Sequence, residues 1–278
     1  MSTLDPPMHA VREIVARALA EDLGPLGDLT AALLPEDATG RAAFVARKEG
    51  VLAGARCATE TFAQLDSAVK LTWLVDDGVE VSAGETLARV EGPLASILTG
   101  ERTALNFLCH LSGIATLTRR FVRATHGRSR IWDTRKTTPG LRALEKAAVR
   151  CGGGVNHRGS LSDFVLVKDN HLAGLTISEA VRRSAMRWPG RAVEVECDNL
   201  EQVHEAISAG ATMVLLDNMG PDKVAEAIGM IKGRAVVEVS GGITIENVGA
   251  YAAAGADLIS AGVITNSAPN LDIGLDLE

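Results

Sequence analysis

The chain has 278 residues, of which 46% are hydrophobic and 23% charged, so its composition is that of a soluble globular protein with room for about two domains. Its formal net charge of -7 argues against nucleic acid or an anionic membrane as the main partner. The N-terminus lacks a basic segment followed by an apolar run, and no apolar stretch approaches the ~20 residues of a membrane span. We therefore expect a cytoplasmic protein.

The four cysteines are scattered and form no C-x-x-C pair. They are Cys57, Cys109, Cys151 and Cys197. This spacing favours reduced, mostly buried thiols and argues against a zinc site.

The first part of the chain predicts a helix followed by short strands. Hydrophobic residues recur at helical spacing from His9 to Leu23. Strand-like runs separated by Gly and Asp turns follow at Ala42–Ala46, Lys70–Val75, Val79–Val81 and Thr86–Val90. The pattern becomes helical again from Thr99 to Thr125, with a joint expected at Gly113, and this stretch is interpreted as the passage between two domains.

Beyond His126, six short apolar runs alternate with amphipathic segments, which predicts repeated βα units around a parallel sheet. The strands are expected at Arg130–Trp132, Phe164–Val167, Val193–Val195, Met213–Leu216, Val236–Val239 and Leu258–Ile259. The helices are expected at Ile177–Trp188, Leu200–Ala209, Pro221–Ile231 and Ile245–Ala254. A charged, hydroxyl or glycine residue follows every strand. This pattern favours a barrel, whose ligands bind at the carboxyl ends of its strands, over a doubly wound sheet. Six units predict that the barrel is incomplete or has one further strand.

Cationic residues follow the first expected strand and precede the second. Arg135 and Lys136 are adjacent after the first, and His157 and Arg158 follow three glycines. Arg can bind a carboxylate or phosphate bidentately, and Lys supplies a point charge. These residues predict an anion pocket inside an acidic protein, with a solvated basic loop as the alternative.

Lys168 directly follows the apolar run Phe164–Val167, so its stem should be buried and its ammonium should face the mouth of the barrel. Two roles are open for it. A charged lysine would bind a substrate anion, whereas a desolvated one could form a Schiff base, as aldolase barrels do. The neighbouring cations favour the first role.

Carboxylates end the next two strands. Glu194 and Glu196 alternate along one strand and so share a face, and Asp217 closes the strand that follows. Such hard oxygen ligands suit Mg²⁺ held together with substrate phosphates. Ion pairing with the basic residues is the alternative.

Glycines and a serine end the last two strands. Ser240-Gly241-Gly242 is expected to join a strand to a helix N-terminus, where backbone N–H groups can hold a phosphate. Gly262 would complete such a cradle after the final strand. Earlier in the chain, Arg102 opens a helix where a cation opposes the helix dipole, a mild departure from local preference that is often functional.

Six motifs in this order resemble the quinolinate phosphoribosyltransferase family, also called nicotinate-nucleotide pyrophosphorylase (carboxylating). They are Thr99–Leu108, Asp133–Arg142, Cys151–Arg158, Val167–His171, Leu215–Met219 and Val239–Ile243. The resemblance implies a pentosyltransferase of NAD biosynthesis. It would join quinolinate to phosphoribosyl pyrophosphate with Mg²⁺, giving nicotinate mononucleotide, pyrophosphate and carbon dioxide.

The resemblance also implies the fold class and the assembly. An N-terminal open α/β sandwich domain is expected over residues 1–113, with the tail 266–278 returning to it, and an incomplete α/β (TIM-like) barrel over 114–265. The family forms homodimers with shared active sites, in which Arg102 reaches the site of the partner subunit. Assembly beyond the dimer is left open.

Site roles follow from the matching motif positions. The quinolinate pocket corresponds to Arg102, Arg135, His157, Arg158 and Lys168. Lys136 corresponds to a pyrophosphate contact, Thr134 is counted with the substrate-binding residues, and the 5-phosphate cradle corresponds to Ser240, Gly241, Gly242 and Gly262. Glu196 and Asp217 correspond to the residues that hold Mg²⁺ and the ribose hydroxyls. The expected catalytic residues are Lys136, Lys168, Glu196 and Asp217.

Two other resemblances compete with this one. A homologue associated with molybdenum transport shares this fold, but the basic pocket argues against it. Residues 79–90 resemble half of a biotinyl or lipoyl carrier, yet no acceptor lysine lies at the turn, so this segment is interpreted as a structural hairpin.

Overall fold

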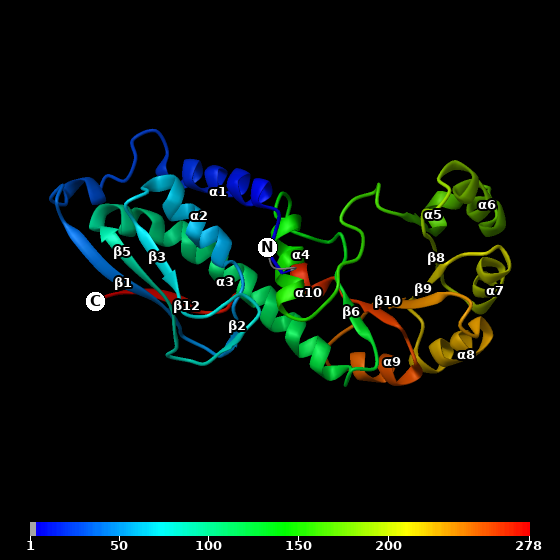
Figure 1. The fold of residues 1–278 in the computed structure, drawn as a ribbon. Coiled ribbons are helices and arrows are strands. Elements are labelled where there is room, and N and C mark those ends of the chain that lie inside the picture. The colour runs from blue at the N-terminus through cyan, green and yellow to red at the C-terminus, as the bar shows by residue number, and fades with distance from the viewer. Residues whose placement is uncertain (1–3) are drawn as a thin grey trace. The chain divides into compact units, whose positions relative to one another are not determined.

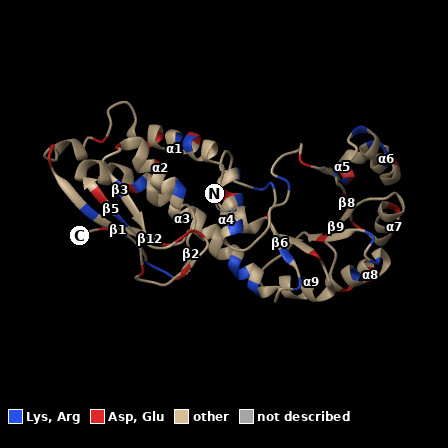
Figure 2. Cartoon of the chain, in the orientation of Figure 1, with Lys and Arg blue, Asp and Glu red and all other residues tan. Residues whose placement is uncertain are grey.

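A computed structural model describes residues 4–278, which divide between two compact units. Unit 1 comprises residues up to 119 together with 137–153 and 264–278, and unit 2 comprises 120–136 and 154–263. The domain boundary expected at residue 113 stays a prediction. No helix among residues 4–278 is both long and apolar enough to cross a bilayer. Charged residues of both signs are spread along both units (Figure 2).

Unit 1 is built around a four-stranded antiparallel sheet with the order β12-β1-β5-β3 (Figure 1). Its strands are β1 (Thr39–Ala46), β3 (Lys70–Trp73), β5 (Thr86–Pro93) and β12 (Ile273–Leu277). A separate pair consists of β2 (Gly50–Val51) and β4 (Glu80–Val81). The helices are α1 (Met8–Leu23), the short 3-10 turn η1 (Ala31–Leu33), α2 (Ala55–Leu65), α4 (Arg142–Cys151) and the larger part of α3 (Leu94–Ala124). The expected strands are present, whereas α2 was not predicted.

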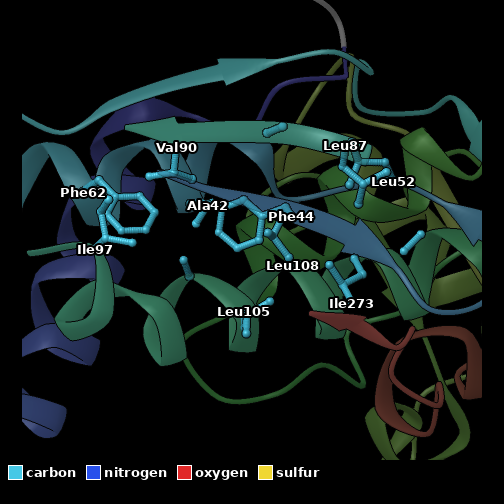
Figure 3. Close-up of a cluster of buried hydrophobic side chains, with 14 of the residues drawn as sticks. Ala42, Phe44, Leu52, Phe62, Leu87, Val90, Ile97, Leu105, Leu108 and Ile273 are labelled. Carbon is cyan, nitrogen blue, oxygen red and sulfur yellow. The ribbon is translucent and has the colours of Figure 1, made fainter. Parts of the chain in front are cut away.

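The core of unit 1 lies between the sheet, α2 and α3 (Figure 3). Phe44 on β1 is fully buried and stacks on Trp73 of β3, with ring centroids 6.3 Å apart. Phe62 of α2 and Leu108 of α3 are buried in the same cluster. Burying each of these side chains stabilises the fold by roughly 1.5–3 kcal/mol.

The helix α3 runs without interruption, so the joint expected at Gly113 is wrong. The glycine serves close packing instead of bending. A Cβ at this position would overlap the carbonyl oxygen of Pro269 and lie 3.0 Å from the Cα of Asn270. The segment that leads into β12 therefore approaches the helix backbone directly.

Unit 2 contains a six-stranded parallel sheet with the order β6-β11-β10-β9-β8-β7. The strands are β6 (Arg130–Trp132), β7 (Val165–Val167), β8 (Val193–Cys197), β9 (Met213–Asp217), β10 (Val236–Ser240) and β11 (Leu258–Ser260). The helices are α5 (Asp169–Leu172), α6 (Ile177–Arg187), α7 (Leu200–Ser208), α8 (Pro221–Ile231) and α9 (Val248–Ala254). The short helix α10 (Val263–Asn266) begins at the last residue of unit 2, and its other residues belong to unit 1. Figure 1 shows α6 to α9 along the outside of the strands.

The barrel of unit 2 is incomplete, as expected. Strands β6 and β7 are consecutive in the chain, yet they lie at opposite edges of the sheet, so the gap falls between them. Within the described residues, the further strand considered from the sequence is reduced to one parallel bridge between Trp132 and Val155. The segment after Val155 therefore runs along the free edge of β6.

Candidate active site

The carboxyl ends of the six parallel strands surround a cavity of about 430 Å³ within unit 2. Because parallel strands end at the same edge of a sheet, residues far apart in the sequence meet there. The lining polar residues are Thr134, Arg135, Lys136, His157, Arg158, Lys168, Glu196, Asp217, Glu238, Ser240 and Ser260. Most residues that the sequence placed at the site are thus brought together.

Four of the expected residues do not line the cavity: Arg102 and the glycines Gly241, Gly242 and Gly262. Arg102 lies on α3 in unit 1, and its side chain is 68% exposed and 3.9 Å from the Oε1 of Glu101. It is not among the residues that line the cavity of its own chain.

Lys168 and Glu196 form an ion pair at neighbouring strand ends. The side chain of Glu196 is 12% exposed and that of Lys168 is 37% exposed. A Schiff-base lysine needs an unengaged amine as its nucleophile, whereas the amine of Lys168 is engaged by a carboxylate. The pairing therefore supports anion binding by Lys168 over Schiff-base formation.

Arg158 is a buried cation beside the aromatic ring of Phe164. The whole residue is 8% exposed, and the guanidinium lies 5.8 Å from the ring centroid. Burial lowers the pKa of Arg158, and the charge of Arg135 lowers it further, while Glu194 opposes both effects. An anionic ligand that enters the cavity would offset the repulsion between Arg135 and Arg158.

The imidazole of His157 contacts two aromatic rings and has a polar partner at each ring nitrogen. Its ring lies 4.8 Å from that of Trp132 and 5.0 Å from that of Phe164. The backbone N–H of Arg158 donates to its Nδ1 over 2.8 Å. Its Nε2 lies 3.2 Å from Glu194 and 3.4 Å from Glu238, so both ring nitrogens already have protein partners.

The protonation of His157 and Glu194 is coupled. Burial lowers the pKa of His157, but hydrogen bonds with Glu194 and Glu238 outweigh it and raise the value to about 9. Burial, together with the nearby charge of Glu238, raises the pKa of Glu194 to about 8, although its hydrogen bond with His157 opposes this. The backbone N–H of Arg158, which donates to Nδ1, favours the neutral imidazole, whereas Glu194 and Glu238 favour the protonated one. In either state Nε2 carries a proton.

Two sets of residues are candidates for holding a metal. Among residues 4–278, one cluster groups three potential ligands, His157, Glu194 and Glu238. Coordination through Nε2 would move the ring proton to Nδ1, which already accepts the N–H of Arg158, so this cluster does not fit a metal site. The pair Glu196 and Asp217 lines the cavity with hard oxygen atoms. Two carboxylates, one of them paired with a lysine, suit Mg²⁺ that is shared with substrate phosphates rather than enclosed by protein.

The glycines after β10 and β11 allow close approaches at the rim of the cavity. Gly241 has a φ of +92°, and a Cβ there would lie 2.8 Å from the backbone nitrogen of Asn218. A Cβ on Gly262 would lie 3.0 Å from the Cδ of Lys136. The helix expected directly after Gly242 is wrong, because α9 begins only at Val248. Any phosphate contact here would come from loop backbone rather than from a helix N-terminus.

Sequence reasoning did not assign Asp133 or Glu238 to the site. Asp133 is fully buried and begins the cationic motif that follows β6. Glu238 lies two residues before Ser240 on the same strand, so it shares the inward face of that serine. The alternation that identified Glu194 and Glu196 could have identified Glu238 too.

Comparisons with known proteins agree with the motifs. The model for the N-terminal domain of quinolinate phosphoribosyl transferase matches residues 28–112, and that for the C-terminal domain matches 114–276. A probable nicotinate-nucleotide pyrophosphorylase (carboxylating) of Bacillus subtilis is 42% identical over 96% of this chain and 93% of its own. A tobacco quinolinate phosphoribosyltransferase (decarboxylating) is 36% identical over 98% of this chain and 83% of its own. The solved nicotinate-nucleotide pyrophosphorylase of Francisella tularensis superposes with a TM-score of 0.96, 38% identity and complete coverage of both chains.

Proposed function

Because this chain belongs to the quinolinate phosphoribosyltransferase family, we propose that it converts quinolinate and phosphoribosyl pyrophosphate to nicotinate mononucleotide, pyrophosphate and carbon dioxide. The observation that carries this proposal is the group of four cations at one cavity of a protein with a net charge of -7. They are Arg135, Lys136, Arg158 and Lys168. Both substrates are polyanions, so the cavity offers the opposite charge to each of them.

The acceptor end of the cavity is assigned to Arg135, Arg158 and Lys168. Two guanidinium groups can each bind a carboxylate bidentately, and the ammonium supplies a third charge. His157 fixes the backbone of Arg158 at this end of the cavity, since the N–H of Arg158 donates to its ring. The pyridine nitrogen would then face the ribose in a fixed orientation, which lowers the entropy cost of the reaction.

The phosphoribosyl end is assigned to Lys136, Glu196, Asp217 and the Ser240–Gly242 loop. Lys136 would stabilise the negative charge that develops on the departing pyrophosphate. Glu196 and Asp217 would accept hydrogen bonds from the ribose hydroxyls and would hold Mg²⁺. When bound, the ion would neutralise part of the pyrophosphate charge.

The chemistry demands little acid–base catalysis from the protein. The C1–oxygen bond of the ribose breaks, and pyrophosphate leaves with the electron pair. The pyridine nitrogen forms the new bond to C1 and becomes positively charged. The 2-carboxylate then departs as carbon dioxide, its bonding electrons remain on the ring carbon, and a proton from solvent replaces it. Positioning and electrostatic stabilisation should therefore supply most of the rate.

The direct test is quinolinate-dependent release of carbon dioxide and pyrophosphate by the purified chain. Phosphoribosyl pyrophosphate and Mg²⁺ are supplied, and carbon dioxide is followed from quinolinate labelled at the 2-carboxylate. We expect both products in equal amounts, each dependent on both substrates. Pyrophosphate release without carbon dioxide would refute the decarboxylating reaction.

We also propose a homodimer whose sites are shared between the subunits, and the exposed apolar residues of unit 1 support it. Leu26, Leu29 and Leu33 are 76%, 65% and 84% exposed. Thr99 donates to the carboxylate of Asp28 over 3.0 Å, which ties this leucine loop to α3 one turn before Arg102. Several large exposed apolar side chains on one short segment are typical of a protein interface.

Mixed dimers test the shared site. Arg102→Ala and Lys168→Ala proteins should each be inactive alone. In a mixed dimer, one site combines the intact barrel of the first mutant with the intact Arg102 of the second. Random mixing makes about half of the dimers mixed, each with one good site of two, so about a quarter of the wild-type activity should return. Mixtures that have exchanged subunits yet stay inactive would contradict the shared site.

A cytoplasmic location is part of the proposal. All four cysteines are free thiols; three of them are buried, and Cys109 is partly buried. Free thiols in place of disulfides are typical of a reducing compartment.

A further inference from the structure

The carboxylate of Asp133 joins the two segments that carry the arginines of the cavity. Asp133 is 0% exposed and directly follows β6. Its Oδ1 accepts the backbone N–H of His157 over 2.9 Å, and its Oδ2 accepts the side-chain amide of Asn156 over 2.6 Å. Arg135 lies two residues after Asp133, and Arg158 lies two residues after Asn156. Neither member of the Asp133–Asn156 pair lines the cavity itself.

This connection lies at the open edge of the barrel. The Val155 N–H donates to the carbonyl of Ile131 over 2.8 Å, and the Asp133 N–H donates to the carbonyl of Val155 over 3.3 Å. These backbone bonds attach the segment to β6 at Val155. Beyond that residue, the contacts of Asp133 with Asn156 and His157 continue the attachment as far as the residue before Arg158.

Electrostatic repulsion acts between Arg135 and Arg158. Arg135 and Arg158 both line the cavity, and the charge of Arg135 lowers the pKa of Arg158, as expected for two like charges in one pocket. A dicarboxylate would offset this repulsion only after it binds. Before binding, the spacing of the cations depends on how firmly their two segments are joined.

We propose that Asp133 and Asn156 are positioning residues that set the spacing of Arg135 and Arg158 for the two carboxylates of the acceptor. The inference rests on the proposed function and deepens it, because it names what determines recognition of a dicarboxylate. The pair acts through the arginines and does not touch the substrate.

A reciprocal exchange of the two side chains tests the pair. In Asp133→Asn, either the new amide group faces the amide of Asn156, or the N–H of His157 loses its acceptor. In Asn156→Asp, the new carboxylate faces that of Asp133. The double variant Asp133→Asn/Asn156→Asp restores one donor and one acceptor with the same total charge. We expect each single variant to raise the KM for quinolinate by about 5- to 150-fold, the range for a mismatched buried hydrogen bond. The KM for phosphoribosyl pyrophosphate should change by less than about 3-fold, and the double variant should recover most of the loss.

Matched controls use the same chemical changes elsewhere in unit 2. Asp257→Asn alters a carboxylate that accepts the N–H of Val237 over 2.9 Å, and Asn199→Asp alters the cap of α7, which accepts the N–H of Gln202 over 2.9 Å. Neither residue lines the cavity, so both variants should keep the wild-type KM values. If a single variant fails to fold, Asn156→Ala, which adds no charge and removes the amide donor, replaces it and should raise the same KM.

The outcomes separate the inference from the proposed function. Phthalate, which has two adjacent carboxylates but no ring nitrogen, is titrated calorimetrically into every variant as an unreactive probe. A wild-type chain that lacks quinolinate-dependent turnover refutes the function, while its phthalate affinities still test the pair. The inference is overturned if the double variant is as impaired as both single variants combined. It is also overturned if both substrates lose affinity equally, or if the single variants bind phthalate like wild type.

Discussion

Removing one carboxylate from the acceptor should nearly abolish turnover, and nicotinate provides this change because it lacks the 2-carboxylate of quinolinate. Its ring nitrogen could still attack the ribose, so the comparison isolates binding of the second carboxylate. The cation left without an anion decides the size of the effect. Of the three cations assigned to the acceptor, Arg158, 8% exposed, is the buried candidate, whereas Arg135 and Lys168 are partly exposed, the latter by 37%.

The buried and the partly exposed candidates predict different magnitudes. Leaving a buried charge without its partner costs about 3–5 kcal/mol, which corresponds to roughly 150- to 5,000-fold in kcat/KM. Losing the partner of a half-exposed lysine costs at most about 1 kcal/mol, or roughly 5-fold. Because the pKa of Arg158 is already lowered by burial and by Arg135, we expect the larger figure.

The assay is pyrophosphate release with quinolinate or nicotinate as the varied substrate. Arg158→Lys provides the matched variant, since it keeps the charge and loses the bidentate geometry. It should lose most of its kcat/KM for quinolinate and little for nicotinate, so that the two substrates converge. A wild-type enzyme that uses nicotinate within 10-fold of quinolinate would refute this account of the cavity.

Three further predictions concern the metal, the buried acids and the rim of the cavity. Calorimetry should detect weak Mg²⁺ binding to the enzyme alone and clear binding with phosphoribosyl pyrophosphate, since two carboxylates are too few ligands; tight binding to the free enzyme would contradict this. Because the pKa of Glu194 is raised to about 8, the folded state holds an extra proton, so the free energy of unfolding should fall from about pH 5 to pH 8. The slope is roughly 1.4 kcal/mol per pH unit for each extra proton and should be shallower in Glu194→Gln, which equilibrium denaturation would measure. Gly262→Ala should displace Lys136 and lower kcat/KM for phosphoribosyl pyrophosphate by about 10-fold. The control Gly229→Ala places its methyl group in open space and should keep the wild-type value. Equal activity of the two variants would refute a role of Gly262 in placing Lys136.

Local patterns in the sequence predicted the elements of unit 2 well. All six strands form where short apolar runs end in polar residues, because a buried parallel strand needs continuous apolar side chains and its end meets solvent or ligand. The weaker predictions involve segments whose state depends on distant packing. The helix α2 was missed, and the continuity of α3 at Gly113 depends on the segment at Pro269, far along the chain.

The sequence by itself also determined which residue types gather at the site, since parallel strands present all their ends at one edge. What only the tertiary structure decided is how these side chains pair. Lys168 faces Glu196 of β8, His157 lies against one acid of β8 and one of β10, and Asp133 contacts a loop more than twenty residues away. Such pairings depend on the register and closure of the barrel, which set distances across the sheet. A one-dimensional pattern records the face on which a side chain lies, but not its neighbour on the next strand.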